Sequence, residues 1–220
     1  KLVDDILSYF QFKATLLGHR WAHRWRASIS TNATLFGDPN VKALMEKYKN
    51  NLSVGVSIDG CPELHDMNRV YPDGSGSMNE ILKHWDWYKN WAGELATTKA
   101  TLNRESIPYI AKSIKYLHED LGLKHINMNF IFEDMGLTED DYIELEKQLE
   151  LSVEYILQHK DDLYFSMLSR EFGCSNSNVK CSDMDSGWCG GGAMPCLTPS
   201  GKIYPCFRFS KITMNDGIPE

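Results

Sequence analysis

The sequence predicts an α/β protein built on parallel strands, followed by a cysteine-rich extension. Short runs of apolar or β-favouring residues alternate with amphipathic stretches, and this order of strand, helix and strand is typical of a parallel sheet or barrel. Five of the six cysteines lie from Cys174 onward, where small and polar residues have replaced the periodic pattern. We therefore expect a regular α/β part and then a module of a different kind.

The first half of the chain is expected to begin with a helix and to continue with two strands. The apolar residues that recur on one face of this first helix are Leu2, Ile6, Leu7, Phe10 and Leu17. Residues 26–31 and 53–59 are short runs that stop at turn residues, as buried parallel strands do. Helical stretches at 40–49 and 77–91 follow these two strands.

The next part repeats the pattern and then changes to a long helix. Residues 95–102 and 125–132 are expected strands, and 106–121 is the helix between them because Ile107, Ile110, Ile114 and Leu117 recur at helical spacing. Gly122 supplies its C-terminal stop. Thr138 opens a helix that runs to about His159, with three acidic residues in the first turn, where the helix dipole favours negative charge.

Two cysteines stand at the ends of an expected hairpin between Cys189 and Cys206. Residues 198–201 predict a turn because Pro199 presets φ and Gly201 tolerates a positive φ, and residues 202–206 can return as a short strand. A hairpin brings its ends together, and soft thiolates suit an iron–sulfur cluster or a zinc ion. Two ligands complete neither site.

Polar side chains close the first two expected strands, where parallel α/β folds gather their chemistry. Thr31 and Asn32 end the first strand. Ser57 and Asp59 alternate with apolar neighbours at the end of the second, so both point to the same side and could hold a hydroxyl-bearing ligand. Arg69 follows Ser57 by twelve residues and offers a planar fork for a carboxylate.

Composition and charge limit the classes of function. The chain has 220 residues, of which 42% are hydrophobic and 24% charged, an ordinary globular composition with a substantial core. Its net charge of −7 argues against a broad nucleic-acid surface. No run of about 18 apolar residues predicts a membrane span, and the amino end lacks a signal-peptide pattern. We expect neither a nucleic-acid nor a membrane partner, and a cytoplasmic location.

These motifs together resemble those of radical S-adenosylmethionine enzymes with a SPASM extension. The resemblance lies in Ser57-Ile-Asp-Gly60, His65-Asp66 and Arg69, after Thr31-Asn32-Ala33-Thr34-Leu35 and before the hairpin that ends at Cys206. It implies a partial (β/α)6 TIM-like barrel followed by the start of a SPASM auxiliary-cluster domain. Residues 1–135 would be the C-terminal part of the barrel, 136–172 a helical bridging region and 173–220 the start of the SPASM iron–sulfur domain.

The resemblance also implies an activity and roles for residues. Such enzymes cleave S-adenosylmethionine reductively at a [4Fe-4S] cluster, and the resulting 5′-deoxyadenosyl radical abstracts hydrogen from the substrate. Ser57 would contact the ribose and Arg69 the carboxylate of S-adenosylmethionine, while Thr31, Asn32 and Asp59 line the same side. Cys189 and Cys206 would ligate an auxiliary cluster, and Cys196 is either a further ligand or a hairpin side chain. The partners implied are a precursor peptide and a reductant such as flavodoxin or ferredoxin.

Departures from the family pattern refine this expectation. The CxxxCxxC loop of the radical cluster and the GGE-type segment occur nowhere in the 220 residues. We expect them to precede Lys1 and the later SPASM cysteines to follow Glu220, so this chain alone should be inactive. Phe207 follows Cys206, at the position where sulfatase-maturating relatives have an Asp that acts as the base. An aromatic ring cannot accept a proton, so this departure favours an enzyme that modifies a ribosomally made peptide, for example by a thioether or another crosslink.

Other interpretations stay open from the residues alone. Ser57 and Asp59 could cap a loop, and Arg69 could be a surface ion-pair residue. Cys61 is expected to be a small buried residue. A zinc-binding adaptor would use the irregularly spaced Cys174, Cys181, Cys189 and Cys206. A radical enzyme that acts on a sulfatase or a small metabolite is the other alternative.

Overall fold

The computed structural model describes residues 1–131, 133–168, 195–198 and 200–205. Its chain divides into two compact units, Lys1–Arg170 and Glu171–Glu220, and each is considered by itself. The expected boundaries near residues 135 and 172 stay predictions.

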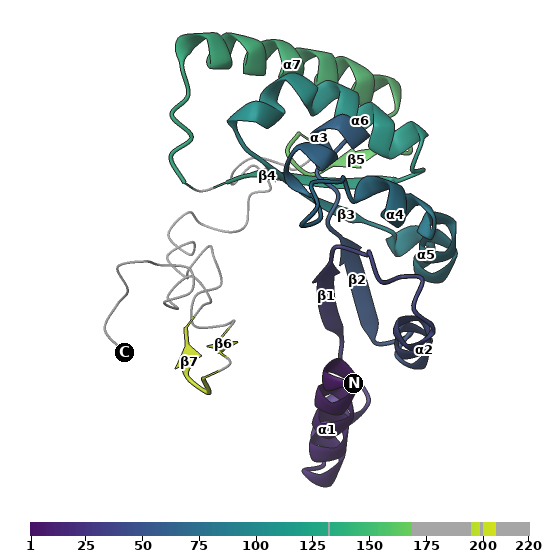
Figure 1. The fold of residues 1–220 in the computed structure, drawn as a ribbon. Helices are drawn as coiled ribbons and strands as arrows, with labels where there is room; N and C mark the ends of the chain where they lie inside the picture. The colour runs from purple at the N-terminus through teal and green to yellow at the C-terminus, as the bar shows by residue number, and fades with distance from the viewer. Residues whose placement is uncertain (132, 169–194, 199, 206–220) are drawn as a thin grey trace, which may run out of the picture. The chain divides into compact units, whose positions relative to one another are not determined.

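The first unit is built on a five-stranded parallel sheet (Figure 1). Its strands are β1 (Ala27–Thr31), β2 (Leu52–Val56), β3 (Thr98–Leu102), β4 (His125–Phe130) and β5 (Tyr164–Phe165), and they lie side by side in chain order. This order is the simplest that repeated crossovers of one hand can produce. The predicted α/β class with a parallel sheet is thereby confirmed. Closure into a (β/α)6 barrel is not, and it remains a prediction.

The helices lie along one face of this sheet, except the first, which lies beyond one end of β1 (Figure 1). They are α1 (Leu2–Leu16), α2 (Pro39–Lys47), α3 (Pro62–Asn68), α4 (Met78–Leu82), α5 (Trp85–Ala92), α6 (Ile110–Glu119) and α7 (Glu139–Gln158). Short 3-10 turns occur at Arg20–Ala22, Gly93–Leu95 and Arg104–Tyr109. Helix α7 packs outside α6, where the Gln148 side-chain oxygen accepts a hydrogen bond from the Ala111 N–H at 3.1 Å.

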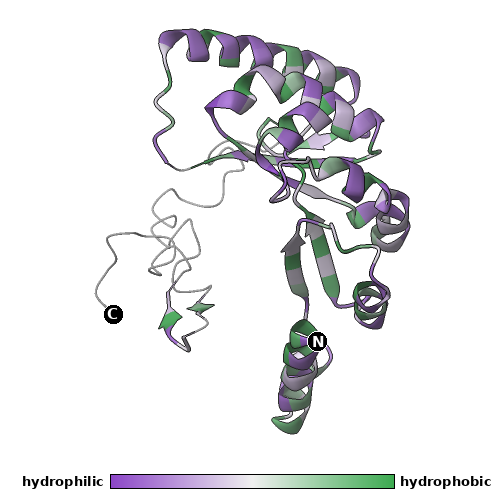
Figure 2. Ribbon diagram, viewed as in Figure 1, coloured by the Kyte–Doolittle hydropathy of each residue, from purple (hydrophilic) through white to green (hydrophobic). Residues whose placement is uncertain are grey.

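Apolar side chains from the strands meet the helices on the covered face. The buried strand residues of this face include Val54, Val56, Ala100, Leu102, Ile126 and Met128. Ile114 and Leu117 of α6 and Tyr88 of α5 are fully buried in the same core. Figure 2 shows the matching pattern, in which hydrophobic and more hydrophilic residues alternate along the strands and along the helices. Helical periodicity in the sequence therefore translates into packing on one side of the sheet.

Two expected helices differ from the structure in detail. The helix expected at 77–91 is divided into α4 and α5, because the His84 N–H bonds to the Ile81 carbonyl three residues back. This tighter turn places the Trp85 indole N–H 3.0 Å from the Leu121 carbonyl. The helix expected at 106–121 begins as a 3-10 turn that contains Pro108, which has no N–H for an α-helical bond.

Some elements were not expected, and one apolar face is largely exposed. Helix α3 and the two-residue strand β5 were not predicted, because both are too short to show periodicity. In α1, Leu7 is buried, but Leu2 and Ile6 of the expected face are exposed, as is Leu17 just after the helix.

In the second unit the structure describes an antiparallel hairpin of β6 (Cys196–Leu197) and β7 (Ile203–Tyr204). Gly201 adopts a φ of +82°, and its N–H bonds to the Thr198 carbonyl at 2.9 Å. The Thr198 N–H bonds to the Lys202 carbonyl at 2.9 Å and closes the turn. The predicted turn, with its glycine at a positive φ and a short returning strand, is confirmed, whereas the expected hairpin ends at Cys189 and Cys206 lie outside the described residues.

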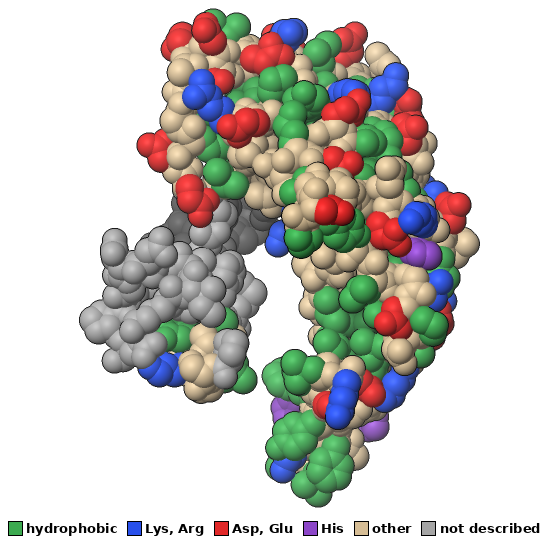
Figure 3. Space-filling view, in the orientation of Figure 1, with side chains coloured by type: hydrophobic (Ala, Val, Ile, Leu, Met, Phe, Trp, Pro, Cys, Tyr) green, Lys and Arg blue, Asp and Glu red, His purple; other side chains and the backbone are tan. Residues whose placement is uncertain are grey.

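The charged side chains of the surface are mixed in sign. Acidic and basic side chains are interspersed over the helices on the face that Figure 3 shows. In the part of the chain that the structure describes, no helix is both long and apolar enough to cross a bilayer.

Candidate functional site

The second face of the parallel sheet is polar. Its residues are Ser28, Ser30, Ser53, Lys99, Thr101, Asn127 and Asn129. In neighbouring strands Ser28 pairs with Ser53, and Lys99 pairs with Asn127. Because side chains alternate between the two faces of a strand, these residues lie on the face opposite the buried apolar residues. Parallel sheets are normally covered by apolar contacts on both faces, so a face of hydroxyls and amides is suited to a polar ligand.

The first strand ends in a strained turn. The Thr31 hydroxyl accepts a hydrogen bond from the Ala33 N–H at 3.1 Å, and the Asn32 side-chain oxygen accepts one from the Thr34 hydroxyl at 3.1 Å. Ala33 is buried and has a φ of +58°, a backbone conformation that is strained for a residue other than glycine. Non-glycine residues in this region are uncommon and cluster where function constrains the backbone.

Ser57 follows β2 beside this turn. Its N–H donates to the Thr31 carbonyl at 2.8 Å, which joins the ends of the first two strands. The residue is half-buried, and within the described ranges its hydroxyl forms no hydrogen bond to protein. A hydroxyl at a strand end with unused hydrogen-bonding capacity is available to a ligand.

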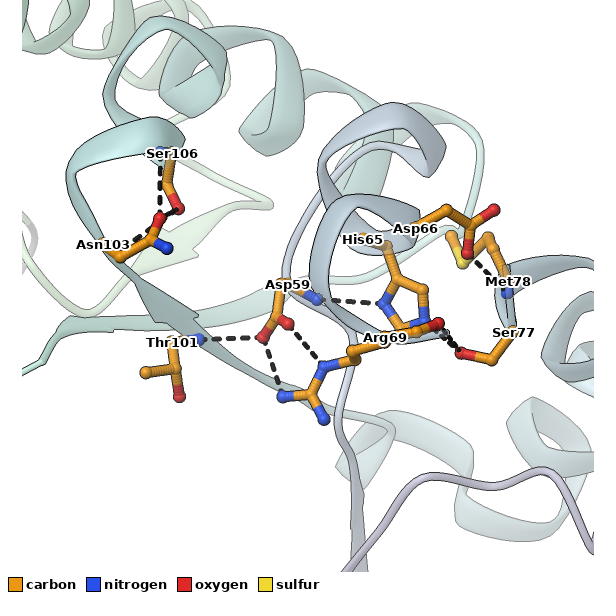
Figure 4. Close-up of polar contacts among 9 residues, drawn as sticks. All are labelled: Asp59, His65, Asp66, Arg69, Ser77, Met78, Thr101, Asn103 and Ser106. Carbon is orange, nitrogen blue, oxygen red and sulfur yellow. Dashed lines mark hydrogen bonds and ion pairs between the residues drawn. The ribbon is translucent and has the colours of Figure 1, made fainter. Parts of the chain in front are cut away.

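Asp59 connects three elements at this end of the sheet (Figure 4). Its carboxylate pairs with the Arg69 guanidinium through both oxygens, and Oδ1 lies 2.9 Å from Nη2. The Thr101 N–H of β3 also donates to Oδ1, at 3.0 Å. Strand β2 pairs with β3 only at Val56 and Thr98, so the Asp59 side chain takes the position of the missing backbone acceptor.

His65 continues the network into the core. Its Nδ1 accepts a hydrogen bond from the Asp59 N–H at 3.3 Å, and its Nε2 lies 3.0 Å from the Ser77 hydroxyl. The Ser77 hydroxyl donates in turn to the Arg69 carbonyl at 2.8 Å (Figure 4). A neutral ring with its proton on Nε2 satisfies both contacts. Burial lowers the pKa of His65, which favours this neutral form.

Gly60 allows this arrangement because it has no side chain, and the space beside it is already filled. Its φ is +148°, and a Cβ would lie 2.2 Å from the Ser113 hydroxyl. That hydroxyl accepts a hydrogen bond from the Cys61 N–H at 3.1 Å. Cys61 itself is fully buried, at the start of α3. The glycine therefore lets the chain turn from the strand end into α3, which carries His65 to the site.

The structure brings most of the predicted residues of the first unit to one end of the sheet. Thr31 and Ser57 are joined through the backbone, and Asp59 is joined to Arg69. Asn32 is exposed beside Thr31. No local pattern in the sequence indicates the hydrogen bond from the Thr101 N–H to Asp59 or the contact of His65 with Ser77. Asp66, which follows His65 in the same motif, accepts a hydrogen bond from the Met78 N–H at 3.0 Å.

The predicted cluster ligands fall mainly outside the described residues. Cys189 and Cys206 lie there, as do Cys174, Cys181 and Phe207. Cys196 is a half-buried free thiol in β6, opposite Tyr204. Within the described ranges, no three His, Cys, Asp or Glu side chains gather as a metal site would require.

Comparison with known proteins gives matches among solved structures only. No family model matches the chain, and no curated protein does. A structure of native anSMEcpe with bound AdoMet (S-adenosylmethionine) is 18% identical, with a TM-score of 0.57 over 91% of this chain and 56% of that one. Native anSMEcpe with bound AdoMet and Kp18Cys peptide is 19% identical, with the same TM-score and coverage.

A third structure gives nearly the same result. Native anSMEcpe with bound AdoMet and Cp18Cys peptide is 19% identical, with a TM-score of 0.56 over 91% of this chain. The present chain covers 56% of these matched chains, just over half of their length. It therefore shares the fold of anSMEcpe over that part of the protein.

Proposed function

We propose that the protein containing this chain is a radical S-adenosylmethionine enzyme with a SPASM extension, and that the strand ends of β1 and β2 help to hold S-adenosylmethionine. The observation that carries the proposal is the joining of Thr31, Ser57, Asp59 and Arg69 at one end of a parallel sheet. The resemblance of these motifs to the family and the shared fold with AdoMet-bound structures support it.

The residues present fit the groups of S-adenosylmethionine. The unused hydroxyl of Ser57 suits the ribose, and the partly exposed Arg69 suits the carboxylate. The turn at Thr31 and Asn32 would form the neighbouring wall. Bound at a [4Fe-4S] cluster, this cofactor supplies the radical that abstracts hydrogen from the substrate. The role of this chain is to bind and orient it.

A peptide is the substrate class that we favour. The polar sheet face offers hydroxyls, amides and one lysine for contacts with a polar chain. Two of the similar structures contain peptides. Phe207, beyond the described residues, lacks the basic oxygen of a sulfatase-maturating Asp, so we propose a ribosomally made peptide and a crosslink such as a thioether. A sulfatase or a small metabolite is the alternative substrate.

The iron–sulfur part of the proposal rests on the sequence. Cys189 and Cys206 would ligate an auxiliary cluster, with Cys196 at the base of the same hairpin as a further candidate. Residues 173–220 would then begin the SPASM domain. A cytoplasmic compartment, which keeps thiols reduced, and an electron donor such as flavodoxin or ferredoxin fit this chemistry. A structural zinc site in an adaptor protein is the alternative to an iron–sulfur cluster. Metal analysis after anaerobic reconstitution distinguishes bound zinc from bound iron and sulfide.

Replacement of Ser57 tests the proposal. In the full-length, anaerobically reconstituted protein, Ser57→Ala should weaken S-adenosylmethionine binding by about threefold to tenfold, the usual effect of one hydrogen bond. Equilibrium dialysis with labelled cofactor measures the affinity. Ser53→Ala is the matched control, because Ser53 is another half-buried serine on the same face of β2. Equal affinity in wild-type and Ser57→Ala proteins would remove Ser57 from the cofactor site.

A further inference from the structure

Arg69 is held at both ends by different neighbours. Its carbonyl accepts hydrogen bonds from the Ser77 N–H at 3.0 Å and from the Ser77 hydroxyl at 2.8 Å. Its own N–H donates to the His65 carbonyl at 3.0 Å, and its guanidinium pairs with Asp59 (Figure 4). A long side chain loses rotamer freedom when it binds a ligand, and an arginine fixed in this way has lost much of it beforehand.

The pair with Asp59 uses only one edge of the guanidinium. Nε and Nη2 both donate to the Asp59 carboxylate, whereas the opposite edge consists of Nη1 and the second hydrogen of Nη2. Within the described ranges, no group accepts a hydrogen bond from Nη1. This second edge has the same two-donor geometry and can therefore receive a carboxylate end-on.

Asp59 is fully engaged with the protein. Its side chain is 7% exposed, against 31% for Arg69, and it accepts hydrogen bonds from the Arg69 guanidinium and from the Thr101 N–H. A carboxylate buried in this way cannot easily reach a ligand hydroxyl itself. Any effect on a ligand would pass through the more exposed arginine.

We infer that Asp59 is a positioning residue, which fixes Arg69 so that its free Nη1 and Nη2 edge receives the carboxylate of S-adenosylmethionine. The inference rests on the proposed function. It assigns Asp59 an indirect role in place of the direct ligand contact expected from the sequence. It also predicts that Asp59 matters for the cofactor only while Arg69 is present.

A double-mutant cycle on the full-length, anaerobically reconstituted protein tests this dependence. The variants are Asp59→Asn, Arg69→Gln and the double variant, all close in shape to the natural side chains. Each single substitution should weaken S-adenosylmethionine binding by about tenfold, as expected for a charge-assisted contact. The double variant should bind no more weakly than Arg69→Gln alone, because both substitutions disrupt the same Asp59–Arg69 pair.

Asp66→Asn is the matched control. Asp66 is another aspartate near this end of the sheet, on α3, and it accepts a hydrogen bond from the Met78 N–H at 3.0 Å and makes no ion pair with Arg69. This variant should lower the thermal midpoint and leave the cofactor affinity within twofold of wild type. A purely structural role for Asp59 would give the same result as this control. Should Asp59→Asn fail to fold, Asp59→Glu, which keeps the charge, enters the cycle in its place.

The possible results separate this inference from the proposed function. If Arg69→Gln weakens binding but the Asp59 variant does not, the positioning role is wrong and the cofactor site stands. If the two single effects multiply in the double variant, Asp59 acts independently of Arg69, and the inference fails as well. If the wild-type protein binds no S-adenosylmethionine, the proposed function itself is wrong.

Discussion

At the residue scale, His65 makes the stability of the site dependent on pH. The ring is buried and bonded as a neutral base between Asp59 and Ser77, and burial lowers its pKa below the usual 6.5. Below about pH 6.5 the unfolded chain takes up a proton here before the folded chain does. The contribution of this residue to stability is thus complete above that pH and falls as the pH drops toward the lower, folded pKa.

This proton uptake makes the free energy of unfolding depend on pH, and the slope of that dependence can be measured. The free energy of unfolding, from urea titrations followed by circular dichroism, should fall between pH 7.5 and pH 5.5 in the natural protein. The fall should be smaller in His65→Gln, which has no proton to take up. Identical slopes in the natural and His65→Gln proteins would contradict the buried, neutral ring.

Gly60 gives a second prediction at this scale. Gly60→Ala should destabilise the protein by about 2 kcal/mol or more, because the new Cβ would lie 2.2 Å from the Ser113 hydroxyl and the φ of +148° disfavours a side chain. Gly74→Ala is the matched control, since it also has a positive φ, +83°, but nothing within 4 Å of an added Cβ. Chemical denaturation midpoints compare the two. Equal losses would show that backbone conformation alone, without the Ser113 contact, accounts for the effect.

At the scale of elements, the start of α7 depends on a local acidic cap. The Asp141 carboxylate accepts hydrogen bonds from the Thr138 N–H at 2.7 Å and from the Thr138 hydroxyl at 2.6 Å, and it lies 2.8 Å from Nε of Arg104. These contacts, with those to Thr138 the largest, lower the pKa of Asp141 to about 2. The cap therefore stabilises the helix above the ordinary pKa of 3.8 and loses its effect as the pH falls toward 2.

Thr138→Ala should lower the free energy of unfolding by about 1 kcal/mol at pH 7, the usual cost of losing such a cap. It should also raise the pKa of Asp141 toward its ordinary value. Urea unfolding gives the first quantity and carboxyl NMR titration the second. Gln158→Ala, at the exposed far end of the same helix, should change neither. An unchanged Asp141 pKa in Thr138→Ala would contradict the cap.

Most elements could be predicted because their signals are local. Strands β1, β3 and β4 lie within their expected segments and β2 begins one residue before its segment, since apolar runs stopped by turn residues indicate burial in a parallel sheet. Strand β2 ends at Val56 and not at residue 59, because the Asp59 side chain takes the hydrogen bond of Thr101 that a longer strand would have used. Helix α3 has seven residues, too few for periodicity to indicate it.

The site could be predicted in part. Ser57, Asp59 and Arg69 stood out as polar residues at and after a strand end. The pairing of Asp59 with Arg69 could not be predicted, because it depends on the direction in which α3 carries Arg69 back to the sheet. The contact of His65 with Ser77 likewise joins residues twelve positions apart through the fold.

At the scale of the whole molecule, the chain supplies one polar sheet face and one sheet end at which Thr31, Ser57, Asp59 and Arg69 gather. It covers just over half of the matched anSMEcpe chains, so the complete activity belongs to the larger protein that we propose. The thiols of the second unit are assigned to that activity from the sequence. The central claim concerns the strand ends, which the structure describes directly.

Hydrogen–deuterium exchange of the full-length, reconstituted protein with and without S-adenosylmethionine tests this claim most directly. The account predicts slower exchange on cofactor binding in peptides that contain Thr31 to Ala33, Ser57 to Gly60 and Arg69. Peptides from the outer helix α7 should be unchanged. Cofactor binding that protects other segments and leaves these strand ends unaffected would contradict the account.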